Sequence, residues 1–407
     1  MVEHPLLFSG FLGSRVHIGV TGSVAAYKAL DILRGLLRAG CSVSATLTRA
    51  AERFVTPLSF QALGADPVYG EMFAGAETID PFGHLAPSHA AKVLLIVPAT
   101  ADILAKLACG LADDMLSCQA LAFRGPLVLA PAMNPAMWAA PATRENWAKL
   151  LGRGALGVEP GLGLAACGDE GQGKLADPAE ILAAALRALS PADMAGKRVL
   201  VSLGPTREAW DAVRFWTNAS SGLMGAALAT AAWLRGAEVT VVAGPVSQPL
   251  PLGIRRVNVN TALEMHAACM DLWPDMDLAC MTAAVADFRP EPYGDQKFKK
   301  DKAGDGLTVR FLPNPDILRD LGANKREEQI LVGFAAETSD LGPQAAKKLK
   351  AKNLDLIVAN RVDRADSGFA SPTNAVCVLD RRGRLEQWPA LPKTEVAWRI
   401  WDLLPQL

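Results

Sequence analysis

The 407-residue sequence lacks an excess of charge of either sign, because 41 lysines and arginines stand against 42 aspartates and glutamates. A nonspecific nucleic-acid binder needs a broad basic surface, so we expect small-molecule partners and no nucleic acid. The seven cysteines are odd in number and show no C-x-x-C spacing, which argues against a disulfide framework and against a zinc site. This cysteine usage is typical of a protein in the reducing cytoplasm.

Long hydrophobic runs free of proline are also missing. The longest uncharged stretch, residues 125–143, contains four prolines and therefore argues against a membrane-spanning helix. The N-terminal residues carry no basic segment ahead of an apolar one, so no signal peptide is expected. Half of all residues are hydrophobic and 20% are charged, a composition that buries large cores. At roughly 150 residues per domain, the length predicts about two to three domains.

Strand-like apolar runs alternate with helical patterns in residues 1–189, which we expect to form the first domain. Residues 25–39 place Leu30, Leu33 and Leu37 on one helical face, and Gly40 follows at a C-cap position. The runs are hydrophobic at consecutive positions, as a parallel sheet covered on both faces requires. They occur at 16–21, 42–48, 93–99 and 126–132.

Serine, proline and glycine gathered at 190–196 indicate a linker, and we expect the second domain to span residues 190–407. Residues 289–306, rich in lysine, proline and glycine, predict a long loop of the kind that forms lids or tethers. A helical pattern at 222–235 is accompanied by strand-like runs at 198–203, 238–243, 277–283, 330–336 and 354–360. The predicted fold class is therefore α/β, with two consecutive domains, each a mostly parallel Rossmann-like sheet covered by helices.

A glycine-rich turn, Gly-Val-Thr-Gly-Ser at 19–23, joins the first strand to the first helix. Its backbone N–H groups and the Ser23 hydroxyl face the place where a phosphate would lie, although such a turn is as often a plain tight connection. Pro-Ala-Thr-Ala-Asp at 98–102 follows the third strand, at the sheet edge where open α/β sheets bind ligands. Further distinctive strings are Ala-Asp-Asp at 112–114, Pro-Ala-Met-Asn-Pro-Ala-Met-Trp at 131–138 and Ala-Cys-Gly at 166–168.

In this order the strings resemble the flavin-dependent phosphopantothenoylcysteine decarboxylases, which belong to the homo-oligomeric FMN-containing cysteine decarboxylases. The resemblance implies a flavodoxin-like flavoprotein domain in which FMN serves as a temporary electron sink. The substrate thiol would be oxidised, carbon dioxide lost, and the hydride returned. The resemblance also implies FMN contacts at Gly22, Ser23, Thr48, Thr100 and Ser117.

Three catalytic residues are implied by the same resemblance. His84 matches the family's catalytic histidine, and imidazole can take up a thiol proton near neutral pH, whereas a lone histidine without the family match is more often structural. Asn134 would hold the cysteinyl carboxylate of the substrate, and Cys167, in a glycine-rich flap, would protonate the enethiolate intermediate. The chain departs from the family at Lys174, where many relatives carry arginine, so a planar guanidinium is replaced by a point charge.

The second half has neither a Walker motif nor a strict GxGxxG turn. Ser220, Ser221 and Gly222 open a helix and offer hydroxyl and free N–H groups to an anion, though by themselves they equally indicate an ordinary N-cap. Lys348 and Lys352 lie four residues apart, so both ammonium groups project from one helical face. That spacing alone does not distinguish a phosphate site from a solvated face.

Together with Ala-Ala-Val-Ala-Asp at 283–287, these residues resemble phosphopantothenate-cysteine ligase over essentially the whole second half. The fused order is similar to the bifunctional family of bacterial coenzyme A biosynthesis. It implies CTP-dependent ligation of 4'-phosphopantothenate with cysteine through an acyl-cytidylate, with Mg²⁺ bridging the phosphates, and then decarboxylation to 4'-phosphopantetheine. Catalytic roles are implied for Asn218 and Lys297, and Asp287 would help order the site or the metal. Implied substrate or nucleotide contacts are Arg214, Ser220, Ser221, Gly222, Ala284, Asp287, Asn314, Asp316, Phe334, Lys348 and Lys352.

Two other function classes explain parts of the pattern. A nicotinamide-dependent oxidoreductase would have two α/β domains, but it requires a GxGxxG turn with an acid at the end of the next strand, which neither half has. A non-catalytic flavin-binding subunit would have lost the histidine or the cysteine, whereas His84 and Cys167 are both present. The family resemblance also implies homo-oligomers, namely decarboxylase trimers assembled up to a dodecamer and ligase dimers whose lids reach across.

Overall fold

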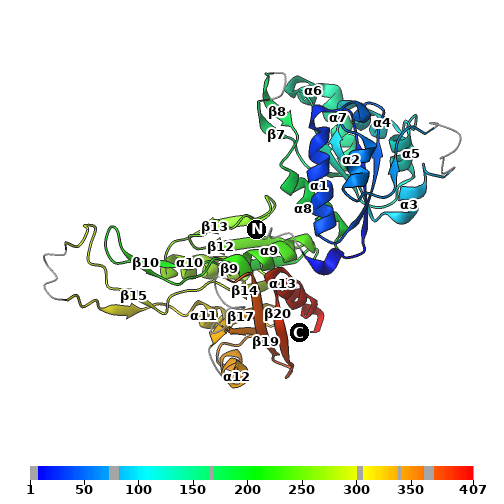
Figure 1. The fold of residues 1–407 in the computed structure, drawn as a ribbon. Coiled ribbons are helices and arrows are strands. Elements are labelled where there is room, and N and C mark those ends of the chain that lie inside the picture. Colours follow the sequence, from blue (N-terminus) through cyan, green and yellow to red (C-terminus); the bar gives the residue numbers. More distant parts are fainter. Residues whose placement is uncertain are drawn as a thin grey trace. The chain divides into compact units, whose positions relative to one another are not determined.

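A computed structural model describes residues 8–72, 82–164, 168–299, 306–337, 341–361 and 371–406 of the chain. Residues 9–191 form one compact unit, and Phe8 together with residues 192–407 forms a second (Figure 1). None of the helices in these described ranges is long and apolar enough to cross a membrane.

The first unit is built on a six-stranded parallel sheet with the strand order β3-β2-β1-β4-β5-β6. The order reverses between β1 and β4, and such a reversal is where open α/β sheets bind ligands, beyond the carboxyl ends of the strands. All residues of β4 are buried, so the parallel sheet predicted from continuous apolar runs is confirmed. The strands are β1 (Arg15–Val20), β2 (Ser42–Leu47), β3 (Val68–Tyr69), β4 (Val93–Ala99), β5 (Leu127–Pro131) and β6 (Leu156–Gly157).

Helices of the first unit pack on the sheet in pairs, with α1 beside α8 and α4 beside α7. The helix expected at 25–39 begins with a 3₁₀ turn, which the Ser23 hydroxyl caps by accepting a hydrogen bond from Ala25 N. A short antiparallel pair consists of β7 (Gly161–Leu164) and β8 (Glu170–Lys174). The helices are η1 (Ser9–Phe11), η2 (Val24–Tyr27), α1 (Lys28–Arg38), η3 (Ala51–Arg53), α2 (Pro57–Ala62), α3 (Ala86–Ala90), α4 (Ala101–Cys109), α5 (Met115–Ala122), α6 (Pro135–Ala139), α7 (Pro141–Gly152) and α8 (Pro178–Leu189).

The second unit has an eight-stranded sheet with the order β13-β12-β9-β14-β17-β18-β19-β20. Its first six strands in that order are parallel, and β19 and β20 complete one edge in antiparallel pairing. The sheet is thus mostly parallel, as predicted, although the antiparallel edge was not anticipated. The strands are β9 (Arg198–Leu203), β12 (Glu238–Ala243), β13 (Arg255–Asn258), β14 (Leu278–Met281), β17 (Ile330–Glu337), β18 (Leu356–Arg361), β19 (Thr373–Asp380) and β20 (Leu385–Pro392).

Two small antiparallel hairpins extend from this sheet (Figure 1). One pairs β10 (Arg207–Ala209) with β11 (Phe215–Thr217), and the other pairs β15 (Phe288–Pro290) with β16 (Phe311–Pro313). The helices of the unit are α9 (Leu223–Leu234), α10 (Ala262–Leu272), η4 (Trp273–Asp275), α11 (Ile317–Ala323), α12 (Leu341–Ala351), α13 (Lys393–Asp402) and η6 (Leu404–Gln406).

Close packing of α9 brings its first turn to the carboxyl edge of the second sheet. The helix is rich in alanine and buried along most of its length. A Cβ atom at Gly225 would lie 2.4 Å from Leu203 Cβ and 2.5 Å from the Thr282 hydroxyl oxygen, so only glycine permits this approach to the ends of β9 and β14. The N-terminus of α9 therefore lies where the strands end.

A buried arginine at the end of α9 ties together three segments of the second unit. The guanidinium of Arg235 is only 4% exposed and donates to Asp193, to Asp402 Oδ1 at 2.7 Å and to the carbonyl of Trp398 at 3.2 Å. The hydrogen bond from Arg235 lowers the pKa of the Asp193 carboxyl below its usual range. These contacts link residue 193, α9 and α13.

We expect Arg235→Met to lower the free energy of unfolding of the second unit by about 2 kcal/mol, less than for a fully buried pair because both carboxylates are partly exposed. A lowered folded-state pKa stabilises the fold above the unfolded pKa of about 4 and loses this contribution as pH falls through the folded value. The difference between wild type and variant should therefore shrink below about pH 4. Urea unfolding at several pH values checks this, and a difference that is independent of pH would contradict it.

Candidate active sites

A cavity of about 750 Å³ lies beyond the ends of β1, β2 and β4 in the first unit. Gly22, Thr48 and Thr100 line it, so three of the five predicted flavin contacts come together from three separate turns. Arg49 and Arg53 add positive charge. The volume suits a mononucleotide, and the hydroxyls with the two guanidinium groups suit its polar part and its phosphate.

Two features fix the walls of this cavity, which we call the edge cavity. The Thr21 hydroxyl donates to the carbonyl of Pro98 at 2.7 Å and accepts from the N–H of Thr100 at 3.1 Å, which joins the turn after β1 to the turn after β4. A Cβ atom at Gly22 would lie 2.5 Å from Ala50 Cβ, so the turn approaches the loop after β2 more closely than any other residue allows. The site is therefore a cradle built by backbone as well as side chains.

A neighbouring cavity of about 390 Å³ contains Ser23 and Asn134 together with Lys28 and Lys174. Asn134 caps α6, because its Oδ1 accepts from Ala136 N at 2.7 Å. Its Nδ2 donates to the carboxylate of Asp169. The amide donor of Asn134 thus already faces a carboxylate, which is the group it is predicted to bind in the substrate.

The Ala-Asp-Asp string forms an ion cluster at the rim of the edge cavity. Lys106 Nζ lies 2.8 Å from Asp114 Oδ2 and 2.9 Å from Asp113 Oδ1. Burial alone would lower the pKa of the Lys106 ammonium, but the hydrogen bonds to Asp114 and Asp113 outweigh it and raise that pKa above its usual range. The ammonium is therefore charged at neutral pH, and the cluster joins α4 to the start of α5.

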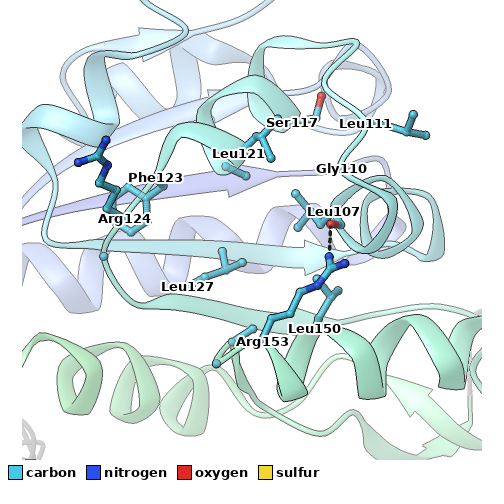
Figure 2. Close-up of a pocket in the computed structure, with 14 residues that line it drawn as sticks. Leu107, Gly110, Leu111, Ser117, Leu121, Phe123, Arg124, Leu127, Leu150 and Arg153 are labelled. Carbon is cyan, nitrogen blue, oxygen red and sulfur yellow. Dashed lines mark hydrogen bonds between the residues drawn. The ribbon is translucent and has the colours of Figure 1, made fainter.

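Ser117 is not brought into the edge cavity. Its hydroxyl donates to the backbone carbonyl of Asp114 and accepts from the N–H of that residue, in a capping box at the start of α5. It lines a different cavity of about 370 Å³ between α4, α5 and α7, where Arg153 donates to the carbonyl of Leu107 (Figure 2). A flavin contact at Ser117 stays a prediction.

His84 lies in a turn held by a buried polar network. Gln119 Nε2 donates to the carbonyl of Gly83 at 3.0 Å, and the Thr46 hydroxyl donates to Gln119 Oε1 at 2.6 Å. His17 completes the network, and burial lowers its pKa to about 3, so this second histidine is neutral and structural. Within the described ranges, His84 lines neither the edge cavity nor its neighbour, and Cys167 lies outside them.

Two adjoining cavities of about 320 and 200 Å³ lie at the carboxyl edge of the second sheet. They share Asp287, Phe334 and Lys352 among their lining residues. We call them together the ligase cavities, after the activity that the sequence resemblance implies for this half of the chain. Arg214 and Lys297 line neither of them. The predicted residues that do are Asn218, Ser220, Ser221, Gly222, Ala284, Asp287, Asn314, Asp316, Phe334, Lys348 and Lys352.

Hydrogen bonds fix several polar side chains in the walls of the ligase cavities. Asn218 Nδ2 donates to the carbonyl of Ala284 at 3.0 Å, and Asn314 Nδ2 donates to the carbonyl of Ala286 at 2.8 Å. Lys352 Nζ lies 2.8 Å from a carboxylate oxygen of Asp316, which also caps α11. The described residues contain no group of three histidine, cysteine or acidic side chains that would hold a metal by itself.

Residues 194–407 match the family model for the C-terminal domain of the DNA/pantothenate metabolism flavoproteins, and residues 12–190 match the flavoprotein model. The chain is 41% identical to the coenzyme A biosynthesis bifunctional protein CoaBC of Vibrio cholerae over 96% of this chain and 98% of that one. It is 42% identical to the CoaBC proteins of Bacillus subtilis, over 94% of both chains, and of Escherichia coli, over 89% of this chain and 90% of that one.

The chain belongs to this family of bifunctional coenzyme A biosynthesis proteins. It is an enzyme with a decarboxylase activity and a ligase activity, and its first half is a flavoprotein. The family predicted from the sequence motifs is therefore confirmed. The roles of individual residues are not tested by these similarities and stay predictions.

The polar residues of the larger ligase cavity that sequence reasoning missed include three from the C-terminal part of the chain. Asn360 and Asn374 come from β18 and β19, and Lys393 is the first residue of α13. Lys393 is only 4% exposed, which is unusual for a lysine outside a site or an ion pair. The polar end of the apolar run at 354–360 was an available signal for Asn360, whereas the other two depend on the antiparallel edge of the sheet.

Proposed function

We propose that the second unit, within residues 190–407, joins 4'-phosphopantothenate to cysteine and that the first, within residues 1–189, decarboxylates the product to 4'-phosphopantetheine. The observation that carries this proposal is the gathering of predicted ligase residues from five separate segments around the ligase cavities. A cytoplasmic location belongs to the same proposal, because the cysteines in the described ranges are free.

The ligase step needs positive charge and N–H donors around a triphosphate, and we assign CTP as the nucleotide. The N-terminus of α9, after Ser221 and Gly222, favours an anion, and Lys348 and Lys352 line the same cavity. Asp287 is the acid that both ligase cavities share, and Mg²⁺ is bound in such sites by one or two carboxylates together with substrate phosphates.

Activation of the carboxylate precedes amide formation. The phosphopantothenate carboxylate attacks the α-phosphate of CTP, pyrophosphate leaves, and the cysteine amine then opens the acyl-cytidylate with release of CMP. We place Asn218 beside the reacting carboxylate of phosphopantothenate, since its amide is fixed to the cavity wall through Ala284. Lys297 would stabilise the negative charge that develops on the reacting groups.

For the decarboxylase step we assign FMN to the edge cavity, with Gly22, Thr48 and Thr100 as contacts and Arg49 and Arg53 near the phosphate. When bound, FMN supplies the two-electron oxidation of the substrate thiol and returns the hydride after carbon dioxide has left.

Three residues of this chain would handle the substrate. We assign Asn134 to the substrate carboxylate, because its amide donor already binds the carboxylate of Asp169. His84 accepts the thiol proton, and Cys167 protonates the enethiolate.

We also propose that the enzyme is a homo-oligomer, with decarboxylase trimers and ligase dimers. Arg214 and Lys297 belong to the hairpin segments and do not line the ligase cavities of their own protomer, which supports a site completed by a second copy. The hairpins also expose Phe215, Trp216 and Phe288 to 47%, 56% and 55%, an apolar surface that a second copy would cover.

The purified protein, incubated with 4'-phosphopantothenate, cysteine, Mg²⁺ and CTP, is expected to yield 4'-phosphopantetheine, with ATP in place of CTP as the comparison. Mass spectrometry identifies the products. Accumulation of phosphopantothenoylcysteine would leave the ligase proposal standing and contradict an active decarboxylase. No cysteine adduct with either nucleotide would overturn the ligase assignment.

A further inference from the structure

A buried carboxylate closes the two hairpin segments of the second unit onto each other. Asp211 lies in the turn between β10 and β11, and its side chain is 0% exposed. Its Oδ1 accepts from the N–H groups of Val213 at 2.8 Å and Arg214 at 2.6 Å. Its Oδ2 accepts from the N–H of Phe298 at 3.0 Å and from Arg214 Nη1, also at 3.0 Å. A carboxylate has about four acceptor positions, and four donors occupy them here.

Aromatic packing supports the same closure independently. The ring of Trp210 lies 5.2 Å from that of Phe298 and 5.7 Å from that of Tyr293, and the Tyr293 and Phe298 rings are 5.0 Å apart. The N–H of Tyr293 donates to the carbonyl of Trp210 at 2.7 Å, and the Arg214 guanidinium lies 5.7 Å above the Trp210 ring. We call Asp211 with these aromatic rings the hairpin clasp. It joins segments that are more than eighty residues apart in the sequence.

The charge state of Asp211 suits this role. Burial would raise the pKa of its carboxyl, but hydrogen bonds from the N–H groups of Phe298, Val213 and Arg214 outweigh burial and lower that pKa below its usual range. The group is therefore ionised at neutral pH. Its negative charge pairs with the guanidinium of Arg214, whose Nη1 lies 3.0 Å from Asp211 Oδ2.

We propose that Asp211 is a positioning residue of the ligase reaction, which fixes the guanidinium of Arg214 directly and the backbone beside Lys297 through the N–H of Phe298. The substrate class is a phosphorylated carboxylic acid, whose carboxylate and phosphate require two cations at a set spacing. This inference rests on the proposed ligase roles of Arg214, which the family resemblance implies as a contact of phosphopantothenate, and of Lys297. Asp211 itself has no contact with the nucleotide in this assignment, because it does not line either ligase cavity.

Asp211→Asn in the full-length enzyme tests the proposal. In asparagine one carboxylate oxygen is replaced by an NH₂ group, which donates and does not accept. At least one N–H group of the clasp then loses its acceptor, and the clasp loosens. We expect kcat of ligation to fall about tenfold and KM for phosphopantothenate to rise about fivefold, because small displacements of positioning groups have effects of this size. The KM for CTP should stay within about twofold, and decarboxylation of supplied phosphopantothenoylcysteine should not change.

Glu208→Gln is the matched control. Glu208 is another buried carboxylate of the same hairpin, only 2% exposed, but its Oε1 accepts from Ala262 N at 2.9 Å and so binds α10 instead of Arg214. We expect the variant to keep the KM for phosphopantothenate. If Asp211→Asn leaves both kcat and that KM unchanged, or raises the KM for CTP in the same proportion, the positioning role is wrong.

A double variant separates positioning from general loosening of the hairpins. If Asp211 acts through Arg214, then Asp211→Asn combined with Arg214→Gln should raise the KM for phosphopantothenate no further than Arg214→Gln alone. If the two substitutions instead multiply their effects on that KM, the inference is overturned. If the Arg214→Gln and Lys297→Gln enzymes both catalyse ligation at the wild-type rate, the proposed ligase roles of these two residues are refuted. That outcome differs from one in which only the positioning role of Asp211 fails.

Discussion

Replacement of Lys297 by alanine is expected to stop ligation while decarboxylation of supplied phosphopantothenoylcysteine continues at the wild-type rate. The lysine lies in the exposed segment after β15, and its neighbour Phe298 is held by the hairpin clasp. Its ammonium would act on charge that develops only during carboxylate activation, and loss of such a group lowers kcat by about 10²–10³-fold. The measurement is the rate of CMP release with saturating phosphopantothenate, cysteine and CTP.

Lys299→Ala is the matched control for this prediction. Lys299 is two residues further along and is exposed like Lys297, so its removal takes the same charge from the same segment. We expect its ligation rate to stay within about threefold of wild type, since screened surface charges have small effects. Equal losses in the two variants would show that only the net charge of the segment matters, and the specific role of Lys297 would be refuted.

His84→Asn is expected to stop decarboxylation, so that phosphopantothenoylcysteine accumulates from phosphopantothenate, cysteine and CTP. Asparagine is polar and of similar size but cannot take up the thiol proton, and loss of general acid–base catalysis lowers the rate by about 10²–10⁴-fold. The rate of carbon dioxide release from supplied phosphopantothenoylcysteine measures the step. Flavin absorbance should show an unchanged FMN content, because His84 does not line the edge cavity.

The control for this prediction is His89→Asn. His89 is exposed in α3, five residues after His84, and has no assigned role. We expect normal decarboxylation in this variant. An active His84→Asn enzyme, or a variant that has lost its flavin, would contradict the assignment of His84 to proton transfer.

The serine residues of the first unit show that a sequence motif does not by itself fix the hydrogen-bond partner of a hydroxyl. Ser23 lies in the glycine-rich turn, and Ser117 follows the Ala-Asp-Asp string by three residues. In the structure both hydroxyls take part in caps, of η2 and of α5. A hydroxyl is as good a capping group as a ligand contact, so its partner depends on the local backbone. Gly22, Thr48 and Thr100 line one cavity because each follows the end of a parallel strand, and those ends share one edge.

The sequence by itself determined the two α/β units and the family. Continuous apolar runs are compatible with strands buried on both faces, and the ordered strings at 98–102, 131–138 and 283–287 are too specific to arise from packing alone. These are local signals, which depend on residues close together in the chain.

Only the tertiary structure decided which polar groups share a site. The antiparallel edge strands bring Lys393 into the larger ligase cavity, the fold neutralises His17 by burial, and Asp211 meets Phe298 across 87 residues of sequence. Each of these depends on strand order and on long-range packing, which no periodicity within one segment encodes.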